Sequence, residues 1–131
     1  MRLLLDTHIL IRLARRDFAQ FDSAMNAALS SPENLLFASA ASFWEIAIKT
    51  RLRKLDPGIA LDELPDFFEA IGLNLLAINH RHAVHVIDPE LPTRDPFDHL
   101  LLAQCAVEGL QLVTHDRALR RHPLAWTAQK R

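Results

Sequence analysis

Four acidic residues from separate stretches of the sequence could act together at one site: Asp6, Glu45, Asp98 and Asp116. Carboxylates that converge in a folded protein repel one another and raise each other's pKa unless a cation lies among them. Because no cysteine or histidine cluster accompanies these acids, the expected cation is Mg²⁺ or Mn²⁺, which prefer oxygen ligands. Such ions bind phosphate oxygens and can activate water for attack on a phosphodiester. The four acids therefore predict metal-dependent chemistry at phosphate.

Each acid also has a purely structural explanation, because Asp and Glu are favoured at the N-termini of helices. Asp6 and Asp116 could each be N-caps, and residues 42–45 fit the capping-box pattern. Asp95 could cap a helix that has Asp98 in its first turn. Capping explains any one acid by itself, so only the convergence of all four favours a metal site.

The pattern of apolar residues predicts the elements that would bring the acids together. Short apolar runs predict strands over residues 3–5, 35–38, 73–78 and 110–114, with a fifth over residues 124–127 at the edge. Helical spacing, with proline and glycine at the boundaries, predicts helices over residues 7–15, 22–30, 39–55, 61–71, 80–87, 96–108 and 117–121. Strands that alternate with helices predict a three-layer α/β/α domain with a central, mainly parallel sheet of about five strands.

This arrangement would place the four acids at one edge of the sheet. Asp6 directly follows the first strand, and Asp116 lies two residues beyond the fourth. Glu45 and Asp98 lie near the starts of helices that begin at the same edge. Ligands bind beyond the carboxyl ends of the strands in folds of this kind, so the predicted position suits a functional site.

Length and composition limit the kind of protein. The 131 residues, half of them apolar, suit a single domain over residues 1–131. The only cysteine, Cys105, excludes an intrachain disulfide, so a reducing, cytoplasmic location is expected. No stretch has the pattern of a signal peptide or a membrane span.

Charge gives a weaker indication. A net charge of -1 excludes the overall positive field of many nucleic-acid-binding proteins. Three local groups of cations remain, each of which could be only a solvated helix face or tail. These groups are Arg12, Arg15 and Arg16; Lys49, Arg51, Arg53 and Lys54; and Arg117, Arg120, Arg121, Lys130 and Arg131.

Four short segments, taken in order, resemble a known family. They are LLLDTH over residues 3–8, SAASFWEIAIK over residues 39–49, DPFD over residues 95–98 and LVTHD over residues 112–116. Over nearly its whole length the sequence is similar to PIN-domain proteins, and most to the VapC-type toxins of bacterial toxin–antitoxin pairs. The resemblance implies an endoribonuclease that cleaves RNA with Mg²⁺ or Mn²⁺, forms a homodimer and binds a cognate antitoxin.

The resemblance also assigns roles to individual residues. The family's catalytic acids correspond to Asp6, Glu45, Asp98 and Asp116. Asp6 and Asp98 are the expected metal ligands, with Thr7 and Thr114 as supporting residues. Asp95 is expected to cap its helix or to support the site, because that helix needs an N-cap.

Three alternatives stay open. A phosphoryl-accepting receiver-like signalling domain has similar length, layers and acids, although it should carry a Lys where His115 follows the late strand. A catalytically silent PIN-like domain that only binds a partner would normally lack one acid of the set. Finally, His80, His82 and His85 could hold zinc, but no cysteine partner or H-E-x-x-H pattern accompanies them.

Two features beside the acids have no settled role. His99 stands where family members usually carry Arg, so the hydrogen bonding next to Asp98 is expected to differ. Phe43 and Trp44 precede Glu45 and could stack on nucleic-acid bases. Because adjacent side chains on a helix point in different directions, at least one of these aromatics is expected in the core.

Overall fold

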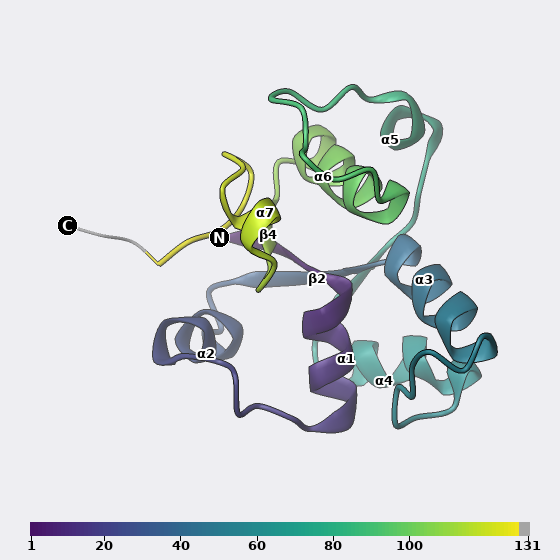
Figure 1. The fold of residues 1–131 in the computed structure, drawn as a ribbon. Coiled ribbons are helices and arrows are strands. Elements are labelled where there is room, and N and C mark those ends of the chain that lie inside the picture. Colours follow the sequence, from purple (N-terminus) through teal and green to yellow (C-terminus); the bar gives the residue numbers. More distant parts are fainter. Residues whose placement is uncertain (129–131) are drawn as a thin grey trace.

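A parallel sheet of four strands lies at the centre of the computed structural model, which describes residues 1–128 (Figure 1). The strands are β1 (Arg2–Leu5), β2 (Leu35–Ser39), β3 (Asn74–Leu76) and β4 (Gln111–Val113), in the spatial order β3-β2-β1-β4. Leu4 of β1 lies opposite Phe37 of β2 and Leu112 of β4. Because every strand runs in the same direction, all the carboxyl ends meet at one edge of the sheet.

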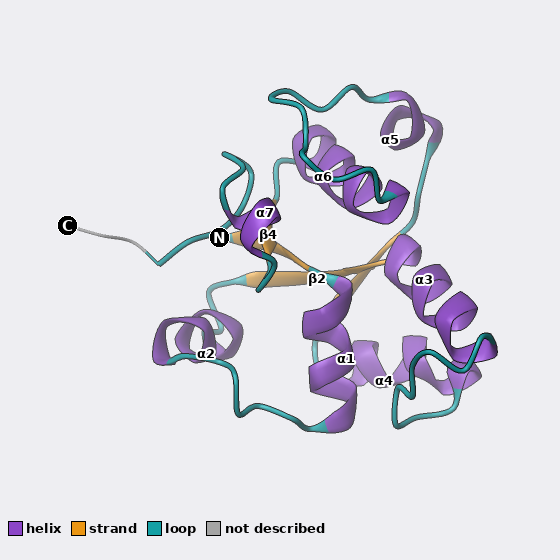
Figure 2. Cartoon of the chain, in the orientation of Figure 1, coloured by secondary structure: helices purple, strands orange, loops and turns teal. Residues whose placement is uncertain are grey.

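Helices cover both faces of this sheet, which confirms the predicted α/β class (Figure 2). They are α1 (Thr7–Arg15), α2 (Ser23–Ser30), α3 (Ala40–Arg51), α4 (Leu64–Ala70), α5 (His80–Val84), α6 (Pro96–Glu108) and α7 (Arg117–Arg120), with a 3-10 turn, η1 (Leu61–Glu63), before α4. Figure 1 shows α5 and α6 on one side of the sheet and α1, α2 and α4 on the other. The helix α3 lies at the end of the sheet and contributes to the core on both sides.

The central strand explains why the sheet is buried on both faces. Leu3, Leu4 and Leu5 are all 0% exposed. Leu3 and Leu5 belong to the core beneath α1, α2 and α4, whereas Leu4 packs with α6, including Leu101. Successive side chains of a strand point to opposite faces, so an unbroken apolar run is expected where helices cover both.

The predicted fifth strand is wrong, because residues 124–127 form only an isolated parallel bridge between Ala125 and Leu112. Its two hydrogen bonds run from Leu112 N–H to Leu124 O and from Trp126 N–H to Leu112 O. The N–H groups of Leu124 and Ala125 are used locally, by the ring and the carbonyl of His122. A tight turn after α7 thus takes up the donors that a longer strand would need.

The predicted helix over residues 39–55 begins correctly but ends too late. Helix α3 stops at Arg51, and Arg53 has a φ of 58°. The N–H groups of Arg53 and Lys54 turn back to the carbonyls of Thr50 and Lys49, which closes the helix with a left-handed residue. No glycine marks this end in the sequence, so the apolar spacing alone predicts a helix that is too long. Helix α5 is likewise shorter than predicted and ends at Val84.

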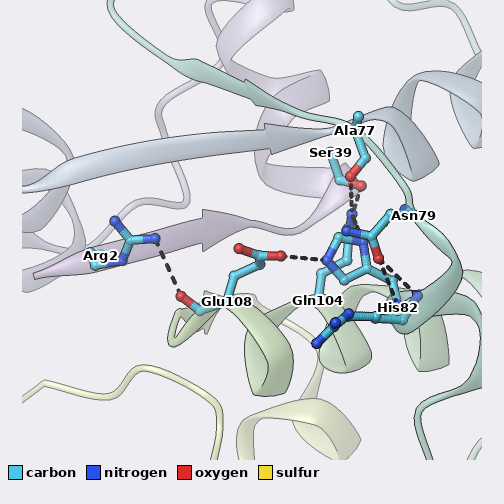
Figure 3. Close-up of polar contacts among 8 residues, drawn as sticks. Arg2, Ser39, Ala77, Asn79, His82, Gln104 and Glu108 are labelled. Carbon is cyan, nitrogen blue, oxygen red and sulfur yellow. Dashed lines mark hydrogen bonds and ion pairs between the residues drawn. The ribbon is translucent and has the colours of Figure 1, made fainter.

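A buried polar network joins the end of β2 to helices α5 and α6 (Figure 3). Its members are Ser39, Ala77, Asn79, His82, Gln104 and Glu108. Gln104 accepts a hydrogen bond from the hydroxyl of Ser39, the N-cap of α3. His82 accepts from Asn79 N–H at Nδ1 (3.1 Å), so its Nε2 carries the proton and donates to Glu108 (2.7 Å). The network therefore fixes where α3 begins.

Three further expectations from the sequence concern membrane spans, the third group of cations and Cys105. Within residues 1–128, no helix has both the length and the apolar character needed to cross a membrane. Lys130 and Arg131 of the third cation group lie outside the described residues. Cys105 is buried in the core against α6 and β4 neighbours, as expected of a small hydrophobic residue.

Candidate active site

Asp6 lies at the carboxyl end of β1 and is the N-cap of α1, as its position in the sequence predicts. Its Oδ1 accepts a hydrogen bond from Thr7 N–H (2.7 Å), and its Oδ2 accepts one from the Thr114 hydroxyl (2.6 Å). Only 3% of the residue is exposed. Burial raises the pKa of Asp6, and these hydrogen bonds only partly oppose that rise. Asp6 is therefore rigidly held in a place where a negative charge is poorly solvated.

Glu45 lies on the face of α3 that is turned toward α1. Ser42, Glu45 and Lys49 share this face, because residues three, four and seven apart lie together on a helix. The Ser42 hydroxyl accepts a hydrogen bond from the Thr7 hydroxyl (2.9 Å), which ties α3 to α1. Glu45 forms an ion pair with Lys49, whose Nζ lies 2.6 Å from Glu45 Oε2. The hydrogen bond with Glu45 and the charges of Glu45, Asp95 and Asp98 together raise the pKa of Lys49, although partial burial opposes the rise.

The predicted capping box over residues 42–45 is wrong. Ser39, the last residue of β2, caps α3 through Ala41 N–H (2.9 Å), so Ser42 lies inside the helix. Ser42 is therefore not a helix cap but lies beside Glu45 on the same face of α3. The sequence carries a signal for it, since Ser42 precedes Glu45 by three residues and so shares its face.

The other acids of the site alter the pKa of Asp98. It is half-buried in the first turn of α6, whose N-cap is Asp95, as predicted. Asp95 accepts from Phe97 N–H at 2.9 Å. Burial first, and then the negative charges of Asp95, Asp6, Asp116 and Glu45, raise the pKa of Asp98 to about 7.

Asp116 is more exposed than the other acids and is the N-cap of α7, as expected. Its Oδ1 accepts from Ala118 N–H (2.8 Å), and its own N–H donates to the hydroxyl of Thr114 (3.0 Å). The same hydroxyl donates to Asp6, so Thr114 connects two of the acids directly. His99 stands next to Asp98, where family members usually carry Arg. Its ring forms a hydrogen bond with the carbonyl of Thr93 at 2.8 Å.

The structure thus brings the predicted acids to one edge of the sheet, close enough for each to raise the proton affinity of Asp98. Within residues 1–128, however, no three Asp, Glu, His or Cys side chains are already arranged to enclose a metal ion. The donor chemistry still fits Mg²⁺ or Mn²⁺. These ions retain several waters and need only one or two direct carboxylate ligands, and the cluster offers oxygen donors with uncompensated negative charge. Asp6 and Asp98 would be those ligands.

Together, fold and site define an α/β domain with an acidic site at the carboxyl edge of a parallel sheet. The sequence model of the PIN domain family matches residues 3–124, so the chain belongs to the PIN domain family. This membership removes the receiver-like alternative.

Two known proteins resemble the chain, one in sequence and one in fold. Ribonuclease VapC16 of Mycobacterium tuberculosis is 38% identical over 60 residues, which are 45% of this chain and 43% of that protein. The match thus spans less than half the length of that relative. The crystal structure of VapBC2 from Rickettsia felis, bound to a DNA fragment from their promoter, contains a chain with a TM-score of 0.61 and 14% identity. It aligns with 95% of this chain and 96% of that one, and at this identity it supports the fold alone.

Proposed function

We propose that this PIN domain is a metal-dependent endoribonuclease that acts as the toxin of a toxin–antitoxin pair. The observation that carries the proposal is that Asp6, Glu45, Asp98 and Asp116 meet at one edge of the sheet, where the Thr114 hydroxyl contacts both Asp6 and Asp116. In agreement, burial and the neighbouring carboxylates raise the pKa of Asp98 to about 7. Such a concentration of negative charge destabilises the metal-free protein and is offset by a divalent cation. The similarity to a protein named as a ribonuclease of the VapC type selects RNA as the substrate.

In this proposal Mg²⁺ or Mn²⁺, when bound, supplies a Lewis acid and an activated water. Asp6 and Asp98 would hold the ion, and Thr7 N–H and the Thr114 hydroxyl keep Asp6 oriented. Glu45 or Asp116 accepts a proton from the attacking water or orients it. The N-terminus of α1, which directly follows Asp6, adds attraction for phosphate oxygens.

Several other features belong to the same proposal. Residues 1–131 form a single nuclease domain, the partner is a cognate antitoxin protein, and the toxin is a cytoplasmic homodimer. The antitoxin partner is proposed from the VapC-type resemblance of the sequence, and the solved structure that shares this fold is that of VapBC2. Light scattering on the purified chain tests the dimer, which would have about twice the 14.9 kDa mass of one chain.

The test compares the wild type with Asp6→Asn and Asp98→Asn, assayed for RNA cleavage with Mg²⁺ or Mn²⁺ and for growth arrest when expressed in cells. Both substitutions keep the size of the side chain and remove one anionic ligand. We expect each to reduce cleavage by at least about a hundredfold, since even residues that only support metal ligands are worth 10–100-fold. EDTA should abolish cleavage by the wild type.

Asp66→Asn is the matched control, because Asp66 is an exposed acid in the first turn of α4, away from the acidic edge. It should cleave like the wild type. If Asp6→Asn and Asp98→Asn also retain full cleavage, the site assignment is wrong. If the wild type cuts no RNA with either ion, the chain is instead the catalytically silent PIN-like domain.

A further inference from the structure

An aromatic pair lies beside the acidic site. The rings of Trp44, on α3, and Phe97, on α6, have centroids 5.8 Å apart and are nearly perpendicular, at 80°. Each ring directly precedes one of the acids, Glu45 or Asp98. Trp44 is 60% exposed despite its size. Its neighbour Phe43 instead turns inward and packs on Phe68. The two adjacent aromatics of α3 therefore have different roles, and only Trp44 faces solvent.

The geometry of the pair leaves aromatic surface free. In an edge-to-face contact one ring contributes only its edge, so its two faces remain uncovered by the partner. An exposed indole held by Phe97 has lost part of its freedom before any ligand arrives, which lowers the entropic penalty of binding. Nucleic-acid bases stack on such surfaces with little dependence on sequence, because every base has a flat π-face.

Charge along α3 favours a nucleic acid as the occupant. Arg51, Arg53 and Lys54 follow Trp44 at the C-terminal end of this helix and its closing turn, and all three are exposed. Within the described part of the chain, none of them pairs with an acid. With a rise of about 1.5 Å per residue, Arg51 lies roughly 10 Å along the helix from Trp44. The aromatic ring of Trp44, the acid Glu45 and the cations thus follow one another along α3 and its closing turn.

We infer that Trp44, supported by Phe97, stacks on a base of single-stranded RNA next to the phosphate at the acidic site, while the cations of α3 contact the flanking backbone. This inference deepens the proposed function, and it names Trp44 as a substrate-positioning residue. A protein segment is the competing occupant. Trp44, Ile48 and Leu52 lie on one side of α3, so a partner helix would contact all three, whereas a stacked base needs only Trp44.

The test measures binding without cleavage, in the Asp98→Asn variant with Mg²⁺. The added substitution Trp126→Phe leaves Trp44 as the only tryptophan, since the sequence has two. The probes are a single-stranded oligoadenylate of about 12 nucleotides and an abasic ribose-phosphate chain of the same length. This length lies within the range of about 4–16 nucleotides that single-strand-binding domains contact. We expect the oligoadenylate to quench the Trp44 emission and the abasic chain to leave it unchanged.

Affinities from fluorescence anisotropy supply the second measurement. Trp44→Ala should weaken oligoadenylate binding about tenfold, which is the scale of one stacked base, and Trp44→Phe less than about threefold. Leu52→Ala is the matched control, because Leu52, the C-cap of the same helix, is 59% exposed and carries no aromatic ring. It should leave the affinity unchanged.

The inference is overturned if the oligoadenylate does not quench Trp44, if no RNA binding is detected, or if Trp44→Ala binds both probes as the parent does. Equal losses for Trp44→Ala and Leu52→Ala would also overturn it, because Leu52 has no ring to stack on a base. Circular dichroism shows whether each variant is folded. If Trp44→Ala does not fold, the affinity of Trp44→Phe for the two probes tests the inference instead. Failure of the wild type to cut RNA would contradict the proposed function and not this binding result.

Discussion

The acidic site and the buried polar network both join α3 to α6, yet they treat polar groups in opposite ways. In the network, Gln104 and His82 find partners on Ser39, Asn79 and Glu108, and donors alternate with acceptors. At the acidic site, groups of the same charge are held near one another, and one lysine offsets them. Satisfied networks stabilise one arrangement of the chain, whereas uncompensated charge lowers stability unless a ligand arrives. The first region serves the fold and the second is suited to function.

The comparison predicts that the largest loss of stability comes from the network. Gln104→Leu removes the acceptor of the Ser39 hydroxyl and the amide donor to the Ala77 carbonyl, so both hydrogen bonds are lost. A buried polar group left unsatisfied is worth about 1–3 kcal/mol, and this applies to the buried Ser39 hydroxyl, whereas water can replace the donor to the exposed Ala77. We therefore expect a loss of about 2 kcal/mol in the free energy of unfolding. Urea denaturation measures it. A loss below about 1 kcal/mol would show that the network does not fix the start of α3.

The acidic site should show the reverse behaviour in the metal-free protein. The folded-state pKa of Asp98 is about 7, above its ordinary value of 3.8, so the folded protein binds this proton more tightly than the unfolded chain. The contribution of Asp98 to the stability of the folded protein should therefore be most favourable below about pH 4. It should decline as the pH rises toward and through 7. Because Asp98 is half-exposed, solvent screening limits the effect to about 1–2 kcal/mol.

Thermal denaturation in EDTA across pH 4 to 8 checks this prediction. Asp98→Asn, which has no charge to lose, should flatten the profile and raise the melting temperature at pH 8 by a few degrees. Added Mg²⁺ or Mn²⁺ should stabilise the wild type more than this variant. An identical pH profile for the two proteins would mean that Asp98 titrates normally and that the acids are farther apart than the structure places them.

The smallest effect should come from the hydroxyl that connects two acids. Thr114→Val removes the donor to Asp6 and the acceptor for Asp116 N–H, so the pKa of Asp6 should rise further. We expect stability to fall by about 1 kcal/mol and metal affinity, measured by calorimetry, to fall about tenfold. Thr50→Val is the control, since the buried Thr50 hydroxyl has no hydrogen-bond partner among the described residues. It should change neither quantity in the unfavourable direction.

Much of the fold follows from local sequence patterns. The unbroken apolar run of β1 and the helical spacing of residues 7–15 predict elements that the structure reproduces. Prolines and glycines mark the boundaries correctly at α6, which begins at Pro96 and ends before Gly109. The errors lie where no such residue marks the end, as at Arg53, or where a local turn competes with a strand, as at His122. In both places hydrogen bonds outside the element decide its length.

By itself, the sequence determined which acids could act together, because each lies at a strand end or a helix start and all such positions share one edge of a parallel sheet. Only the tertiary structure decided how those acids are held. It places the Thr114 hydroxyl between Asp6 and Asp116, moves Ser42 from a cap to the wall of the site, and turns Trp44 outward while Phe43 enters the core. The physical reason is that these contacts join residues far apart in the chain. Burial and hydrogen bonding across elements, and not local propensity, set them.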